Sequence, residues 1–226
     1  GVHLLNILRS INKWVRPYMY DDEIKTPPKK RKETKKKVKV KKLTKNDKKP
    51  TELDAVKRGE IGIKMITVNY ALDKDSAFQR LDKSHSHIAY YHHTREKHQI
   101  AVRFEPQSGF RYYQRNERKR RNFKPLIEPK YEAWDKTHLI PVGFHGSEND
   151  PRLLIGWSSR LNRGAIKKHE DKVTNVNQGH TIYWFVDVEK HRESGGAYWT
   201  STVWFEDGSL VDEQKFYDKS KFHWSY

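Results

Sequence analysis

The residues best suited to chemistry gather between Trp134 and Gln178. His138 is of the one type that exchanges protons near neutral pH, while Asn162 and Glu170 carry oxygen donors eight positions apart, a spacing that puts both on one helix face. The chain has no cysteine, so any metal ion must be held by His, Asn, Asp or Glu. Taken singly, a strand histidine is more often packed and a helix-start asparagine is usually a cap.

Two strands and a helix are predicted to position these side chains. The apolar runs 137–144 and 152–157 flank the turn-rich segment 146–151, a pattern typical of a hairpin. From 161 to 176 the apolar residues recur at helical spacing, with Ile166, His169 and Val173 near one face. The sequence therefore predicts the order strand, strand, helix.

This order and its fixed points resemble the DNA/RNA non-specific endonuclease family of ββα-metal nucleases. That family carries Asp-Arg-Gly-His on the first strand, where this chain has Asp135-Lys136-Thr137-His138. On the helix it has an asparagine followed eight positions later by a glutamate, matched here by Asn162 and Glu170. The resemblance covers about 45 residues. It implies an endonuclease that hydrolyses phosphodiester bonds of DNA or RNA.

The resemblance also implies a role for each residue. His138 takes a proton from the water that attacks phosphorus, and Asp135 and Lys136 belong to the same catalytic motif. A single divalent ion, Mg²⁺ or Mn²⁺, is bound by Asn162, and Glu170 accepts hydrogen bonds from the water molecules on that ion. Asn149, in the hairpin, is a further candidate ligand.

The chain departs from the family pattern at two positions. Lys136 replaces an arginine, which exchanges a planar fork of donors for a point charge. Thr137 replaces a glycine and fills space that the family leaves open. A second family arginine lies roughly thirty residues before the histidine, and both Arg103 and Arg111 are plausible counterparts.

Charge favours a nucleic-acid partner. The formal net charge is +17. Nucleic acid is the commonest binding partner of proteins with so large a positive charge. The segment 111–121 interleaves two tyrosines with basic residues, a mixture that can stack on bases while neutralising phosphates, although a solvated loop explains it equally well. The candidate nucleic-acid contacts are Arg103, Arg111, Arg115, Arg118, Arg120 and Arg163.

Composition divides the chain into three parts. Residues 1–25 contain an amphipathic helix that could bind a protein partner. Residues 26–50 hold thirteen Lys or Arg against two acids and are predicted to be a flexible linker. Residues 51–226 form the nuclease-like domain, with strands expected at 61–70, 86–91, 99–104, 181–188 and 198–205. The fold class is therefore α+β, with a mixed or antiparallel sheet.

Other interpretations stay open. A nucleic-acid-binding protein could keep the ββα scaffold without cleaving, and an adaptor could use the helix at 2–18. His85 and His87 could share a strand face and chelate a metal, although no acid or cysteine nearby completes such a site. No apolar run is long enough to span a bilayer, so the expected location is intracellular, in the cytoplasm, with secretion or nuclear targeting as alternatives.

Overall fold

The computed structural model describes residues 49–131 and 133–226, with side chains except at 161–163. The predicted helix at 2–18 and nearly all of the basic segment 26–50 lie outside the described residues. Within the described ranges, no helix is long and apolar enough to cross a membrane.

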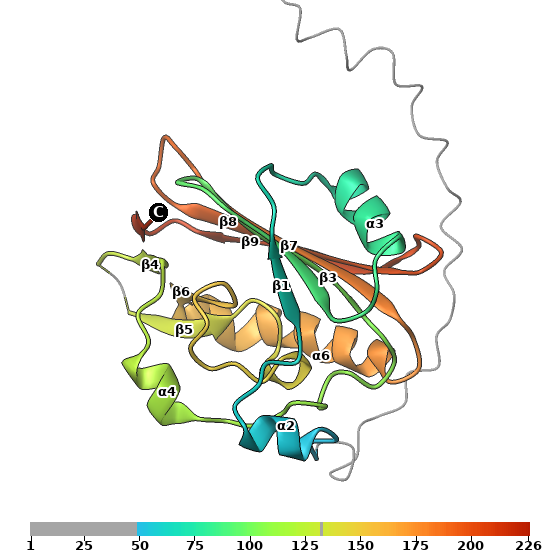
Figure 1. Ribbon diagram of the computed structural model, residues 1–226. Helices are drawn as coiled ribbons and strands as arrows, with labels where there is room; N and C mark the ends of the chain where they lie inside the picture. Colours follow the sequence, from blue (N-terminus) through green and yellow to red (C-terminus); the bar gives the residue numbers. More distant parts are fainter. Residues whose placement is uncertain (1–48, 132) are drawn as a thin grey trace, which may run out of the picture. The chain divides into compact units, whose positions relative to one another are not determined.

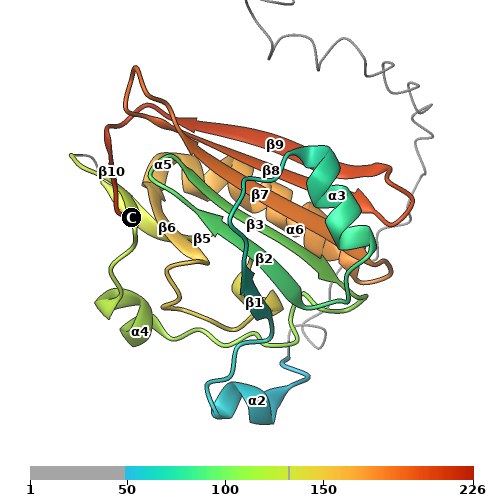
Figure 2. The ribbon, with the colours of Figure 1, turned by 45° about the horizontal axis from the view of Figure 1, so that its top comes forward.

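A six-stranded sheet organises the described chain, in the order β1-β2-β3-β7-β8-β9 (Figures 1 and 2). The edge strand β1 runs parallel to β2, and every other neighbouring pair is antiparallel. The central strands are rich in β-branched and aromatic residues because both of their faces are covered. The bounds are β1 Lys64–Thr67, β2 Ile88–His93, β3 Lys97–Phe104, β7 Ile182–Lys190, β8 Ala197–Phe205 and β9 Leu210–Asp218.

Helices cover both faces of this sheet. Helix α3 (Lys74–Asp82) lies on one face, where Leu81 packs with Tyr183 in a small apolar cluster, and α6 (Lys167–Asn177) lies on the other (Figure 1). A capping box between Asp73 and Ser76 starts α3. The larger core lies on the α6 face and includes Trp184. The class is therefore α+β, as the sequence predicted.

The chemistry-bearing segment forms a hairpin followed by a helix. Strands β5 (Trp134–His138) and β6 (Leu154–Ser158) pair antiparallel, with His138 opposite Leu154. The chain then enters α5 (Ser159–Leu161), a π-helical turn η4 (Asn162–Ile166) and α6 without a break. The first strand ends earlier than expected, because Pro141 starts a 3₁₀ turn, η3 (Val142–Phe144), whose side chains are buried.

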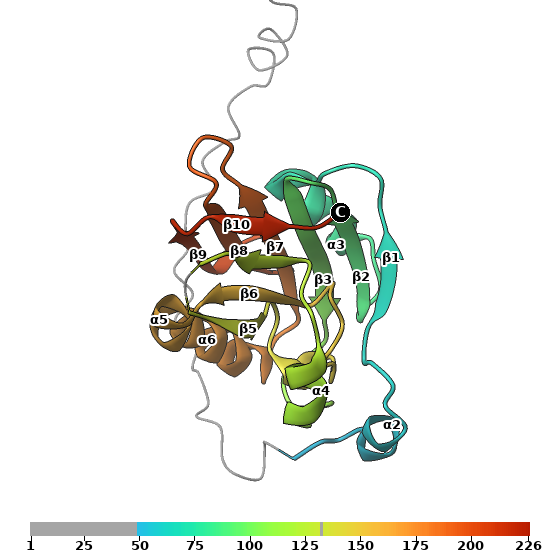
Figure 3. The same ribbon diagram turned by 90° about the vertical axis from the view of Figure 1, so that its left-hand side faces the viewer.

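Three short elements complete the fold. Helix α2 (Leu53–Lys57) precedes β1, α4 (Glu117–Asn122) precedes the hairpin, and β4 (Ile127–Pro129) pairs antiparallel with β10 (Phe222–Trp224). Figure 3 shows β10, β4, β6 and β5 side by side. Helices α3 and α4 and the edge strand β9 were not predicted.

Candidate active site

A cleft of about 750 Å³ opens between the start of α6, β5, η3 and the segment 109–120. His138 and Glu170 line this cleft together, from the hairpin and the helix respectively. Its charged lining is mostly basic and consists of Arg115, Arg120, Lys136 and Lys167, with Glu170 and Asp171 as the acids. A basic cleft containing an imidazole and a carboxyl can bind an anion and exchange a proton with it.

His138 is held in one orientation by the turn that follows β5. Its Nε2 lies 2.9 Å from the carbonyl oxygen of Ser147 and 3.1 Å from Oε1 of Glu148. Since a carbonyl can only accept, Nε2 carries the hydrogen and Nδ1 is left as the basic nitrogen. Nδ1 has no hydrogen-bond partner in the described part of the chain. The ring can therefore accept a proton at Nδ1 from the cleft.

Glu148 is the acidic partner of this histidine and is almost fully buried, with 1% of its side chain exposed. Its Oε2 accepts a hydrogen bond from the amide of Asn116 at 3.0 Å. Burial would raise the pKa of Glu148, but His138 and the Asn116 amide lower it below its ordinary value. The ionised carboxylate can thus stabilise a protonated His138, as the acid of a His–carboxylate pair does.

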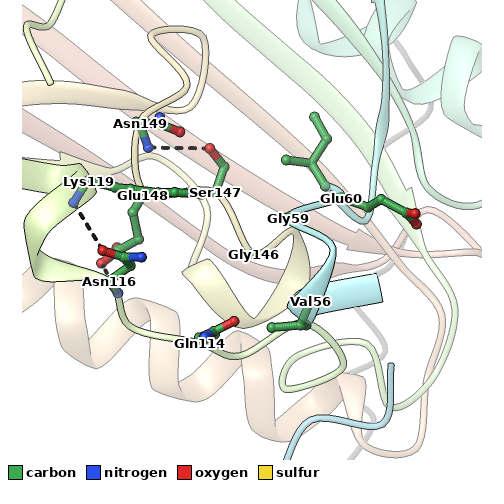
Figure 4. Close-up of a pocket in the computed structure, with 11 residues that line it drawn as sticks. Val56, Gly59, Glu60, Gln114, Asn116, Lys119, Gly146, Ser147, Glu148 and Asn149 are labelled. Carbon is green, nitrogen blue, oxygen red and sulfur yellow. Dashed lines mark hydrogen bonds between the residues drawn. The ribbon is translucent and has the colours of Figure 1, made fainter. Parts of the chain in front are cut away.

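A small hollow of about 50 Å³ is lined by Glu148 together with Ser147 and Asn149 (Figure 4). Asn149 lines this hollow and not the cleft, and its backbone amide donates to Oγ of Ser147 at 3.4 Å. The structure therefore does not bring Asn149 to His138 and Glu170 as a ligand. The acid of this turn that reaches His138 is its neighbour Glu148, which the sequence analysis overlooked.

His145 fixes the turn that carries Glu148. Its Nε2 donates to the carbonyl of Ile140 at 2.9 Å, and its Nδ1 accepts from the amide of Ser147 at 3.0 Å. Both nitrogens are used by the neutral ring, so protonation would break the bond to Ser147. Burial accordingly lowers the pKa of His145 to about 3.

Glu170 enters the cleft from the first turn of α6. Burial raises the pKa of its carboxyl to about 8, and Lys167 opposes this shift only in part. An ionised carboxylate at this position therefore requires a nearby positive charge.

The carboxyl of Glu170 offers oxygen atoms, which are the ligands that a hard divalent cation prefers while it keeps most of its water molecules. Within residues 49–131 and 133–226, no three His, Asp or Glu side chains are grouped so as to hold a metal ion. The first expected ligand, Asn162, begins the π-helical turn, but its side chain is outside the described part.

Lys136 lines the cleft but is already engaged. Its Nζ donates to the carbonyls of Arg120 and Arg121 at 2.9 and 2.7 Å, and so caps the C-terminal end of α4. Lys136 thus positions the basic helix α4 beside the cleft. One of its three donor hydrogens remains for an anion.

Most of the other predicted site residues lie elsewhere. Arg103 projects on the α3 side of the sheet, where it donates to Tyr183 and pairs with Glu206. Arg111 forms an ion pair with Glu105. Neither candidate for the upstream arginine lines the cleft, and neither do Asp135 and Arg118, whereas Arg115 and Arg120 do. The side chain of Arg163 is outside the described part.

The predicted histidine cluster does not form a metal site. His85 and His87 lie before β2 and not on a strand, and His87 has a φ of 66°, which breaks the expected alternation. Farther along, His93 and His98 contact each other through their Nδ1 atoms at 2.8 Å. The outer nitrogens of both rings face backbone carbonyls, so the pair serves packing between β2, β3 and the C-terminal segment.

Comparisons with protein-family models, with curated proteins and with solved structures found no match to this chain.

Proposed function

We propose that this chain is a metal-dependent endonuclease of the ββα-metal class that hydrolyses phosphodiester bonds of DNA or RNA. The observation that carries the proposal is the placement of His138 and Glu170 in one basic cleft, from a β-hairpin and the helix that follows it. The order and spacing of the same residues in the sequence, which resemble the family motif, are consistent with it.

Each of these residues has its own role in the proposed hydrolysis. Nδ1 of His138 accepts the proton of the attacking water, and Glu148 stabilises the imidazolium that results. Arg115 and Arg120 neutralise the phosphate charge in the cleft. Asn162 and Glu170 would hold the cation, Asn162 directly and Glu170 through water. A divalent ion bound there supplies charge stabilisation for the phosphoryl oxygens.

The direct test is cleavage of plasmid DNA and of a structured RNA, with Mg²⁺ and with EDTA. We expect cleavage only with the metal, and a loss of about 10² to 10⁴ in turnover for His138→Ala. His85→Ala is the matched control, because His85 is exposed and lies outside the cleft. Cleavage by a folded His138→Ala protein at the parental rate would overturn the proposal.

The alternative is a nucleic-acid-binding protein that does not cleave. The engagement of Lys136 with α4 favours it, because that lysine is less available to a phosphate than the family arginine. Under this alternative, anisotropy of a labelled oligonucleotide reports salt-sensitive binding while no divalent metal produces cleavage.

A further inference from the structure

An aromatic pair lines the cleft beside the arginines. The rings of Phe110 and Tyr113 meet edge to face, with centroids 5.8 Å apart and an interplanar angle of 65°, and both residues line the cleft that contains His138. Tyr113 is 37% exposed, which is high for so large an apolar group. The pair is stabilised by its own contact, while part of Tyr113 stays open to a ligand.

The two adjacent tyrosines of this segment have different environments. Tyr112 packs closely against Gly62, where a Cβ would collide with its ring. Tyr113 turns instead to the cleft. The sequence did not predict which of the two rings would be accessible, because an irregular segment has no periodicity from which buried and exposed positions could be assigned.

The segment that carries Tyr113 is fixed to the elements that carry the proposed catalytic residues. The amide of Tyr112 donates to the carbonyl of Gly143 at 2.9 Å, and a Cβ at Gly143 would collide with the backbone of Gly109. At its start, the amide of Ser108 donates to Oδ1 of Asn177, the last residue of α6, at 2.9 Å. Hydrogen bonds to η3 and to α6 therefore fix the segment of Tyr113 beside the cleft that His138 lines.

We propose that Tyr113 is a stacking platform for an unpaired base, and that the cleft therefore binds single-stranded nucleic acid in preference to duplex. A base inside a duplex already stacks on its neighbours and cannot offer a face to a tyrosine, whereas an unpaired base can. Arg115 and Arg120 line the same cleft and supply positive charge for the adjoining phosphates. This inference deepens the proposed function and rests on it for the identity of the ligand as nucleic acid.

The test measures binding separately from cleavage. The full chain carrying His138→Ala is titrated, in EDTA, against labelled DNA and RNA strands of mixed sequence and against the corresponding duplexes. We expect tighter binding of the single strands. Adding Tyr113→Ala should weaken single-strand binding about tenfold, within the usual value of one base–aromatic stack, and should change duplex binding little. Tyr113→Phe should retain the preference, because stacking needs the ring and not the hydroxyl.

Two controls make the result specific. Tyr131→Ala, at a tyrosine that is 82% exposed and outside the cleft, should leave binding unchanged. A strand of abasic sites should bind equally to the proteins with and without Tyr113→Ala, because it offers no base to stack. Equal losses on single strand, duplex and abasic strand would overturn the inference. Single-strand preference without any metal-dependent cleavage would instead reject the nuclease proposal and leave this inference standing.

Discussion

Two histidine–carboxylate pairs of the described residues, His138–Glu148 and His169–Asp212, have different surroundings, because only His138 lines the basic cleft. His138 and Glu148 meet beside the basic cleft at 3.1 Å. His169, on α6, donates from Nδ1 to Asp212 at 2.7 Å, and its Nε2 lies 2.7 Å from Oγ of Ser201. The second group has the hydrogen-bond order of a serine–histidine–aspartate triad and shorter contacts than the first.

Access distinguishes the two pairs. Ser201 is 1% exposed, and its hydroxyl oxygen also accepts from the indole of Trp184 at 2.9 Å. No substrate can reach that hydroxyl, so the buried group holds α6 against β8 and β9. Hydrogen-bond geometry alone therefore does not identify a reactive site. What matters here is that, within the described residues, only one nitrogen of the His138 ring is hydrogen-bonded, and that this ring lines a cleft.

The sharpest test of this comparison is to remove each histidine in turn. His138→Ala should lower turnover by about 10² to 10⁴ while the protein stays folded. His169→Ala should lower the free energy of unfolding by about 1.5 to 3 kcal/mol, because the carboxylate of Asp212 loses a hydrogen bond while keeping its ion pair with Lys172, with turnover per folded molecule nearly unchanged. Urea unfolding and cleavage assays on both variants check this. A His169→Ala protein that is stable but inactive would contradict the assignment.

A smaller effect on turnover is expected at Glu148. Glu148→Gln keeps an oxygen for the amide of Asn116 but removes the negative charge beside His138. We expect kcat to fall about 10- to 100-fold, as for other residues that orient a reacting group, with little change in KM. Glu193→Gln, at an exposed position, is the control. An unchanged kcat for a folded Glu148→Gln protein would mean that the carboxylate only supports the turn.

The sequence predicted the framework around the cleft better than its details. The hairpin, the helix and five strands of the sheet were expected, since their apolar residues follow the period of each element. Strand β9 was missed because its apolar residues do not alternate with polar ones: Val211 and Phe216 are buried five positions apart, while the apolar residues Leu210 and Tyr217 are exposed. Helix α4 was missed because none of its residues is buried, which leaves no apolar stripe to detect.

The errors in the site have a different cause. Arg103 was a reasonable candidate by its distance along the sequence from His138, but spacing does not tell which side of β3 it occupies, and it lies on the α3 side. Asn149 and Glu148 are neighbours in an irregular turn, where only the backbone path decides which one reaches His138. Such choices depend on tertiary contacts, as with Arg111 and its ion pair to Glu105.

The buried histidines should also make stability depend on pH. His145 has a pKa lowered by burial to about 3, and burial lowers the pKa of His169 as well, against opposition from Asp212. The His145 ring is therefore neutral in the folded protein at neutral and mildly acidic pH, while the pKa of His169 lies below its ordinary value. Their contribution is complete above the unfolded pKa of about 6.5 and is lost as the pH falls from there toward the folded values.

Between pH 7.5 and 5.5, His145 alone should lower the free energy of unfolding by about 1 kcal/mol, and His98, whose pKa burial also lowers to about 3, adds to this loss. Urea titrations at the two pH values measure it. His145→Gln, which can keep a donor for Ile140 and an acceptor for Ser147, should be less stable at pH 7.5 but should lose less on acidification. His85→Ala should keep the parental pH dependence. Equal losses in all three proteins would show that these buried rings do not set the acid response.

The smallest effect is expected at Lys136, where the two roles assigned to one side chain can be separated. Its Nζ caps α4 through the carbonyls of Arg120 and Arg121. Lys136→Ala should cost about 0.5 to 1.5 kcal/mol of stability through the lost hydrogen bonds and should lower cleavage, because Arg120 is then less well positioned.

Two further variants separate capping from charge. Lys136→Gln keeps a donor without the charge, whereas Lys136→Arg keeps the charge and adds the planar fork found in the family. If capping dominates, Gln restores both stability and cleavage. If the charge acts on the phosphate, Gln restores stability alone, while Arg matches or exceeds the parental rate. Lys130→Gln, at an exposed lysine outside the cleft, is the control. A Lys136→Ala protein with parental stability and parental cleavage would exclude both roles.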